Sequence, residues 1–145
     1  MIRTLALLFL TALFLYSDGT VRIQQEIYTQ ILSALFPKKR PIKVWVESPK
    51  TFLVLQNIPF VHIVSKPQQA DVLIIRKNRN ILSPQICDKI VLSESYQLIK
   101  REKGCVIGGF FWHKGRPNII FLEQNLHKHH IHLPHEMEQF IEDKL

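Results

Sequence analysis

The chain has 145 residues, of which 46% are hydrophobic and 21% are charged, and its formal net charge is +7. This length suits a single globular domain. The lysines and arginines occur in short scattered groups, which excludes a long basic tail of the kind that binds nucleic acid. We expect no nucleic-acid partner. The positive charge indicates a preference for anionic ligands or for an anionic membrane surface, or else an ordinary solvated basic surface.

The first 17 residues have the layout of a secretory signal peptide. Arg3 supplies a positive charge, residues 5–15 are apolar apart from Thr11, and small or polar residues follow. The apolar run is too short to span a bilayer, which requires roughly 20 residues. We therefore expect residues 1–17 to be cleaved near Ser17, leaving residues 18–145 as one domain in the periplasm. The alternative is an uncleaved N-terminal anchor.

The first half of the mature chain predicts two helices and three strands. Ile23, Ile27, Ile31 and Leu35 recur every four residues, which is typical of an amphipathic helix over residues 21–36 that ends at Pro37. Ser48 and Pro49 then have the order of an N-cap and a first helical residue. The predicted elements after the first helix are a strand over 42–46, a short helix over 48–55, a strand over 60–64 and a buried parallel strand over 71–75.

The second half of the chain continues this alternation. Ser93 or Ser95 is expected to cap a helix that Gly104 ends, and Gly115 permits a hairpin turn. The predicted elements are strands over 90–92, 106–112 and 118–122, and helices over 96–101, 123–128 and 134–144. Together these elements indicate an α/β fold: a single three-layer domain with a mixed, mostly parallel sheet of five or six strands and a C-terminal β-hairpin plus helix.

Several short segments in this order resemble the YfiR-type family of periplasmic regulators. They are the apolar strand over 70–75, the segment 90–93, the Gly108-Gly109 strand, and the run 119–121 that leads to Asn125. The resemblance extends over nearly the whole mature chain. It implies a non-enzymatic protein that restrains a membrane-anchored diguanylate cyclase. A looser similarity links the chain to one lobe of periplasmic solute-binding proteins.

The two cysteines, Cys87 and Cys105, are a candidate disulfide. An exported chain enters an oxidising compartment, where an even number of cysteines favours pairing. The alternative is a pair of buried free thiols.

The segment around the predicted hairpin turn is the first candidate contact site. Arginine and lysine can hold a carboxylate or phosphate, and tryptophan and arginine are enriched at protein interfaces. A partner, a small anionic ligand and a plain basic turn all remain open as explanations. The residues of this site are Trp112, His113, Lys114, Arg116 and Asn118.

The histidine-rich C-terminal segment is the second candidate site. His127 and His130, and likewise His132 and His135, are three residues apart, and neutral imidazoles bind zinc, copper or nickel. The alternatives are adventitious metal binding and a polar surface, and the imidazoles would also permit pH sensing.

No catalytic set is visible, and no cofactor is expected. Gly108-Gly109 lacks the frame of a phosphate-binding loop and indicates close backbone approach instead. Glu94 follows the strand over 90–92, at the edge where α/β proteins bind ligands, but the sequence offers it no obvious partner. We therefore expect an exported non-enzymatic protein that regulates a membrane signalling partner. The alternatives are a solute-binding-like module for a small anion and a metal-binding protein.

Overall fold

The computed structural model describes the backbone from Ile2 to Leu145 and the side chains from Gly19 onward. Helix α1 (Ile2–Leu35) is continuous, so the expected helix start near residue 21 is wrong. The expected cleavage position at Ser17 lies outside the residues whose side chains are described. Within the described part of the chain, no helix combines the length and the apolar character needed to cross a membrane.

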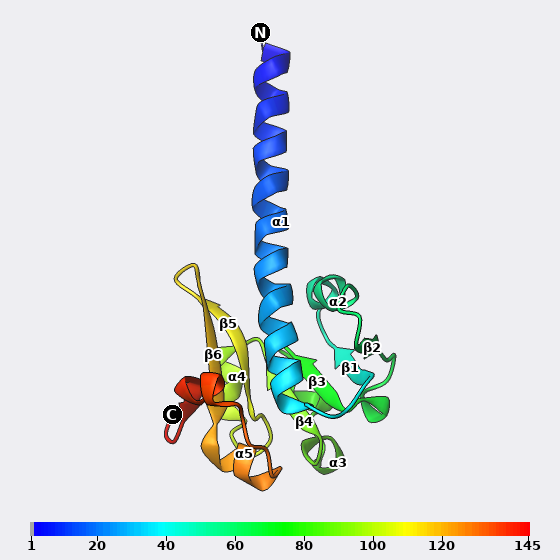
Figure 1. Cartoon of the computed structure of the whole chain (residues 1–145), viewed down its shortest axis with the longest axis vertical. Helices are drawn as coiled ribbons and strands as arrows, with labels where there is room; N and C mark the ends of the chain where they lie inside the picture. Colours follow the sequence, from blue (N-terminus) through cyan, green and yellow to red (C-terminus); the bar gives the residue numbers. More distant parts are fainter. Residues whose placement is uncertain (1) are drawn as a thin grey trace.

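A seven-stranded sheet forms the centre of the domain (Figure 1). Its strand order is β2-β1-β3-β4-β5-β6-β7, and every neighbouring pair is parallel except the β5–β6 hairpin. The α/β class and the mostly parallel sheet are confirmed, with more strands than the expected five or six. The strands are β1 (Ile42–Val46), β2 (Val61–Ile63), β3 (Val72–Ile75), β4 (Ile90–Ser93), β5 (Gly108–His113), β6 (Arg116–Leu122) and β7 (Ile141–Glu142).

Helices cover both faces of the sheet, as the continuously apolar strands predict. On β3, Val72 and Ile74 face one core, while Leu73 and Ile75 face the other. The first core contains residues of α1, α2 (Pro49–Leu55) and α5 (Glu123–Lys128). The second contains residues of α3 (Pro84–Cys87) and α4 (Tyr96–Arg101). Three 3-10 turns complete the fold: η1 (Pro67–Gln69), η2 (Arg79–Ile81) and η3 (His135–Phe140).

The C-terminal helix expected over residues 134–144 is wrong. The chain forms η3 and then strand β7, in which Ile141 pairs with Phe121 of β6. Met137 is buried in the first core and Phe140 and Ile141 pack against it, so a tighter turn and a sheet edge bury these apolar residues in place of a helix. Pairing with β6 gives the backbone of Ile141 and Glu142 a partner, which a free helix end would lack.

The β5–β6 hairpin is also tighter than the sequence indicated. Only Lys114 and Gly115 form the turn, both with positive φ (50° and 74°), and His113 pairs with Arg116. A two-residue turn of this kind matches the twist of the flanking strands. The strands therefore extend almost to the tip, where residues 113–117 had been expected to form a loop.

Two close contacts fix β5 between its neighbours. A Cβ on Gly108 would lie 2.0 Å from the Ile120 carbonyl oxygen, and one on Gly109 would lie 1.9 Å from the Ser93 carbonyl oxygen. Neither site has room for a side chain, which confirms the close backbone approach inferred from the Gly-Gly pair.

Cys87 and Cys105 are joined by a disulfide, with their Cα atoms 4.8 Å apart. The bond links the end of α3 to the segment that precedes β5. Cys105 and the half-buried Cys87 belong to the second core, so the disulfide cross-links the chain on the side of the sheet that α3 and α4 cover.

Candidate functional site

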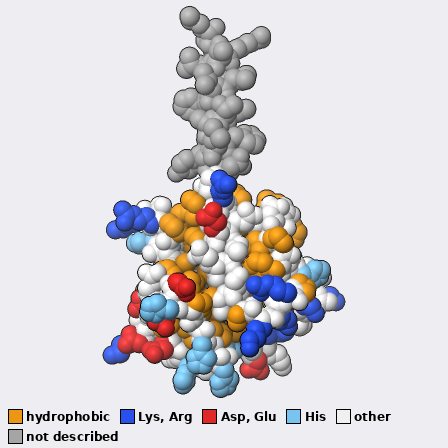
Figure 2. All heavy atoms as spheres, in the orientation of Figure 1, with side chains coloured by type: hydrophobic (Ala, Val, Ile, Leu, Met, Phe, Trp, Pro, Cys, Tyr) orange, Lys and Arg blue, Asp and Glu red, His pale blue; other side chains and the backbone are white. Residues whose placement is uncertain are grey.

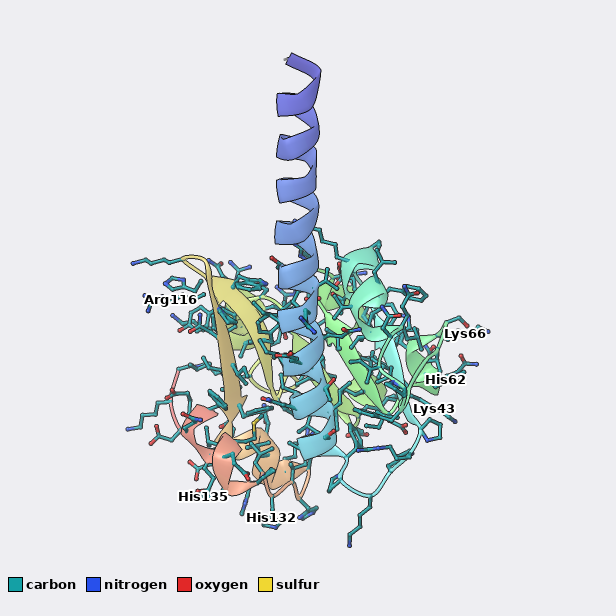
Figure 3. All side chains as sticks on the ribbon, turned by 45° about the horizontal axis from the view of Figure 1, so that its top comes forward. Lys43, His62, Lys66, Arg116, His132 and His135 are labelled. Carbon is teal, nitrogen blue, oxygen red and sulfur yellow. A yellow bond between two sulfur atoms is a disulfide. The ribbon has the colours of Figure 1, made fainter. Side chains whose placement is uncertain are left out.

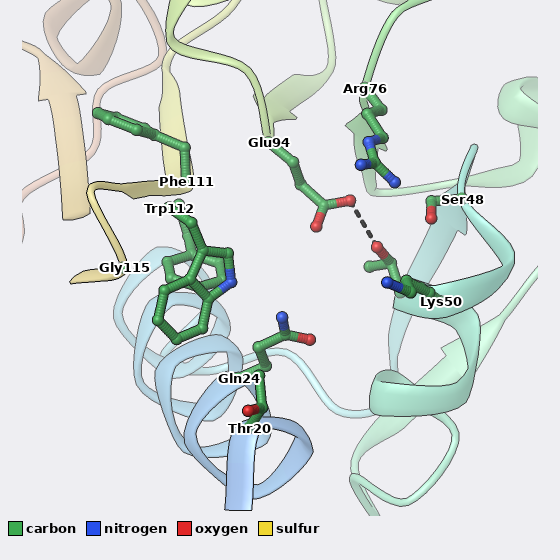
Figure 4. A pocket seen from close by; sticks show the side chains of 11 residues that line it. Thr20, Gln24, Ser48, Lys50, Arg76, Glu94, Phe111, Trp112 and Gly115 are labelled. Atoms are coloured by element: carbon green, nitrogen blue, oxygen red, sulfur yellow. Dashed lines mark hydrogen bonds between the residues drawn. The ribbon is translucent and has the colours of Figure 1, made fainter. Parts of the chain in front are cut away.

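A pocket of about 370 Å³ lies at the carboxyl edge of the parallel strands. The strand order reverses between β1 and β3, and the crevice at such a switch point is where open α/β sheets bind ligands. Residues that follow β1, β3 and β4 meet here with α1 and β5 (Figure 4). The lining residues are Thr20, Gln24, Ser48, Lys50, Thr51, Arg76, Glu94, Phe110, Phe111, Trp112 and Gly115.

Glu94 occupies the centre of this pocket, directly after β4 (Figure 4). The Thr51 hydroxyl donates a hydrogen bond to its carboxylate across the switch point. Burial raises the pKa of Glu94 above its ordinary value, and the hydrogen bond from Thr51, the contact with the Tyr28 hydroxyl and the charge of Arg76 offset only part of this effect. Glu94 is therefore a largely buried carboxyl whose charge is incompletely compensated by the protein.

Tyr28, on α1, lies beneath this site, and its hydroxyl is close enough to Glu94 for the two groups to influence each other's pKa. Burial and then the negative charge of Glu94 raise the pKa of Tyr28. The hydroxyl nevertheless meets strict hydrogen-bond geometry with no described group. Its contact with the Glu94 carboxyl is therefore a poorly aligned hydrogen bond.

The loop that carries Arg76 is held by Glu47, the residue after β1. The Glu47 carboxylate accepts hydrogen bonds from the backbone N–H groups of Arg76, Lys77 and Asn78. The carbonyl of Ile74 also accepts a hydrogen bond from the Glu47 backbone. These contacts hold the segment after β3 against the segment after β1. The backbone of Arg76 is therefore fixed relative to β1.

The cationic side of the pocket contains Arg76 and Lys50, both exposed, and the Ser48 side chain lies between them (Figure 4). Ser48 occupies the N-cap position of α2 and Pro49 the first helical position, as predicted, and the Ser48 side chain makes no cap hydrogen bond. Its hydroxyl faces the pocket instead. This side can bind a carboxylate or phosphate.

Aromatic rings form the opposite wall. Phe110 contacts Tyr28 edge to face at 5.7 Å, and Trp112 contacts Phe110 in the same way at 5.6 Å between ring centroids. Phe110 is buried, whereas Trp112 is 39% exposed and faces the cavity. The row of rings therefore runs from the core under α1 to the rim of the pocket.

Of the residues predicted around the hairpin turn, only Trp112 joins this pocket. His113, Lys114 and Arg116 are exposed at the hairpin tip, and Asn118 donates a hydrogen bond to the Arg116 carbonyl oxygen. The basic residues of the predicted tip thus lie next to this pocket without lining it.

The predicted histidine site lies elsewhere. His132 and His135 are at the end of the domain away from the pocket (Figure 3), and several histidines gather there on the surface (Figure 2). His127, His130 and His132 line a separate hollow of about 300 Å³, and His135 contacts Glu138 at 3.1 Å. Among the described residues, no three histidine, cysteine, aspartate or glutamate side chains converge as metal ligands would. Burial and the charge of Lys128 lower the pKa of the nearby His129.

Sequence reasoning identified the place of Glu94 but missed its partners. Thr51, Arg76 and Tyr28 lie on three other segments, and only the sheet order brings them together. A usable signal was present: Glu47, Arg76 and Glu94 each directly follow a strand of the parallel sheet.

Comparisons with known proteins bear on the fold only. No protein-family model and no curated protein sequence matches the chain. A crystal structure described as a conserved domain protein from Vibrio cholerae O1 biovar El Tor is similar, with a TM-score of 0.50 and 9% sequence identity. The match covers 81% of this chain, which spans 58% of the length of that structure.

Proposed function

We propose that this chain is an exported, non-enzymatic ligand-binding domain for a small molecule that bears an acidic group. The observation that supports this proposal is the convergence of Arg76, Glu94 and Trp112 in one pocket at the switch point of the sheet. Small ligands bind in such crevices through a few polar groups on a largely preformed wall. The Cys87–Cys105 disulfide fits an oxidising compartment.

A thermal-shift screen of small carboxylates, amino acids and phosphate esters tests this function. A ligand that binds only the folded state raises the melting temperature as its concentration increases. We expect at least one compound to stabilise the wild type, and Arg76→Ala to abolish that effect. Lys77→Ala is the matched control, since it removes a neighbouring charge that does not line the pocket. Equal stabilisation of wild type and Arg76→Ala, or none from any compound, would contradict the proposal.

We further propose that ligand binding regulates a membrane signalling protein through α1. Thr20 and Gln24 of α1 line the pocket, so an occupied pocket contacts the helix directly. The resemblance of the sequence order to YfiR-type regulators suggests a membrane-anchored diguanylate cyclase as the partner class. Co-purification from solubilised membranes, with and without the ligand, tests this. Failure to recover a membrane partner in either condition would reject the regulatory role while leaving ligand binding intact.

A further inference from the structure

We propose that the ligand of this pocket is a zwitterion with an ammonium group and a carboxylate on one small skeleton, as in an α-amino acid. This inference rests on the proposed ligand-binding function and specifies its ligand class. Its basis is the presence of opposite charges in one cavity that are not paired with each other. Of the ion pairs among the described residues, none involves Arg76, Lys50 or Glu94.

Glu94 supplies the site for the ammonium group. A carboxylate has about four lone-pair positions, and Thr51 is the residue that donates a hydrogen bond to it with good geometry. Burial disfavours the ionised form of Glu94 and raises its pKa. An ammonium group carries three donors and a positive charge, so it would stabilise the ionised carboxyl that the empty pocket disfavours.

The buried hydroxyl of Tyr28 lies beside Glu94, and the two groups shift each other's pKa. Tyr28 does not line the pocket, so it acts on a ligand only through Glu94. Its neighbour Glu94 faces the cavity. When an ammonium group holds Glu94 in the ionised form, the carboxylate becomes a better acceptor for the phenol.

Arg76 and Lys50 supply the site for the carboxylate. A guanidinium presents paired donors that match the two oxygens of a carboxylate, and Lys50 and the Ser48 hydroxyl lie on the same side of the cavity. The cavity, at about 370 Å³, is at the small end of the range for ligand sites. The exposed face of Trp112 can receive an apolar or aromatic substituent.

Ligands whose charges all have the same sign fit this arrangement less well. A phosphate or dicarboxylate would meet the negative charge of Glu94 in the same cavity, and a simple amine would meet Arg76 and Lys50. Like charges brought together at short range cost energy and discriminate against the wrong ligand. A zwitterion satisfies both sides at once.

The test is a comparison of matched analogues by isothermal titration calorimetry on the full chain. The standard L-amino acids are first screened, and the best binder is compared with the same skeleton lacking the amino group and with the same skeleton lacking the carboxylate. For phenylalanine these are 3-phenylpropionate and phenethylamine. We expect the amino acid to bind about tenfold more tightly, or better, than either analogue. Equal binding by the des-amino analogue overturns the zwitterion inference but leaves an anion-binding function in place.

A substitution of Glu94 tests the proposed ammonium site separately from the cationic side of the pocket. In Glu94→Gln, we expect the affinity ratio between the amino acid and its des-amino analogue to fall to about one, because the amide no longer attracts the ammonium group. The exposed, remote Glu123→Gln serves as a matched control and should keep the wild-type ratio. A Glu94→Gln protein that retains the wild-type ratio overturns the inference. If no amino acid binds while another acidic compound does, the inference fails alone; if nothing binds, the proposed function fails as well.

Discussion

The Thr51 hydroxyl donates a hydrogen bond to the Glu94 carboxylate, which joins helix α2 to the loop after β4, across 43 residues of the chain. Thr51 belongs to α2, after β1, and Glu94 directly follows β4. Strand β3 lies between β1 and β4 in the sheet, so this contact spans the opening of the crevice. The hydrogen bond therefore defines the position of the carboxyl group that we place at the centre of the site.

The stability of the free domain should depend on the ionisation of Glu94. Its folded-state pKa lies above the ordinary value of 4.5 because burial disfavours the charged form. The contribution of Glu94 to folding stability is therefore fully present below the pKa that it has in the unfolded chain. This contribution is lost as the pH rises through the higher pKa that Glu94 has in the folded protein. We expect the melting temperature of Glu94→Gln, relative to wild type, to increase over that pH range. Parallel curves for the two proteins would contradict the raised pKa.

Loss of the Cys87–Cys105 disulfide should destabilise the domain substantially. The bond closes a loop with a sequence separation of 18, for which the chain-entropy model gives about 3 kcal/mol. Urea unfolding with and without a reductant measures this change. The double variant Cys87→Ala/Cys105→Ala should unfold at lower urea and be insensitive to the reductant. An unchanged midpoint on reduction would show that the disulfide contributes little.

The two glycines of β5 should differ sharply from Gly104. A Cβ at Gly109 would lie 1.9 Å from the Ser93 carbonyl oxygen, a backbone atom that cannot move without disturbing the β4–β5 pairing. We expect Gly109→Ala to cost about 3 kcal/mol or more, because overpacking against backbone is rarely relieved. Gly104 has no atom within 4 Å of its Cβ position, so Gly104→Ala should be neutral or slightly stabilising. Similar losses in both variants would reject this explanation.

The sequence was informative wherever local chemistry determined the structure. The bounds of β1, α4 and α5 agree with prediction, because alternating apolar residues and helix-start signals act over a few residues. Strand β7 was missed because its two residues form a strand only by pairing with Phe121 and Leu122. The hairpin loop was overestimated because the strands were expected to stop at residues 112 and 118, whereas Trp112 pairs with Pro117 and His113 pairs with Arg116.

The candidate site could be predicted only in part for the same reason. Glu94 was placed at a ligand-binding edge from its position after a buried strand, and the Gly-Gly pair correctly indicated close packing. The opposing charges of Arg76 and Glu94 belong to one pocket only because β3 and β4 are adjacent and parallel. The sequence did not indicate that Trp112 lines the crevice while its neighbours at the tip do not, because a dense local pattern does not reveal which strand edge faces the crevice.

Removing the Tyr28 hydroxyl should stabilise the empty domain. The group is buried and has no well-formed hydrogen bond, and an unsatisfied buried hydroxyl costs about 1 to 3 kcal/mol. We expect Tyr28→Phe to gain about 1 kcal/mol in chemical denaturation, because the phenylalanine ring keeps the edge-to-face contact with Phe110 and lacks the hydroxyl. Ala34→Ser, on the same helix, is a comparison that introduces a buried hydroxyl and should destabilise. A loss of stability in Tyr28→Phe would mean that the hydroxyl is satisfied.

Glu47 should act as a positioning residue for Arg76. Its carboxylate accepts hydrogen bonds from the N–H groups of Arg76, Lys77 and Asn78, and hydrogen bonds to a charged acceptor contribute about 1.5 to 3 kcal/mol each before exposure to solvent weakens them. Glu47→Ala frees these three amides. We expect them to exchange with solvent faster and the ligand affinity to fall severalfold, because Arg76 no longer starts from a fixed position.

Hydrogen exchange distinguishes this positioning role from a general loss of stability. Amides in the buried strand β4 should keep their protection in Glu47→Ala, since local opening of an exposed loop does not require global unfolding. Glu47→Gln keeps one carbonyl acceptor without the charge, so both its exchange rates and its affinity should be intermediate. Unchanged exchange at residues 76–78 in Glu47→Ala would show that the loop is held by other contacts, and the position of Arg76 would then not depend on Glu47.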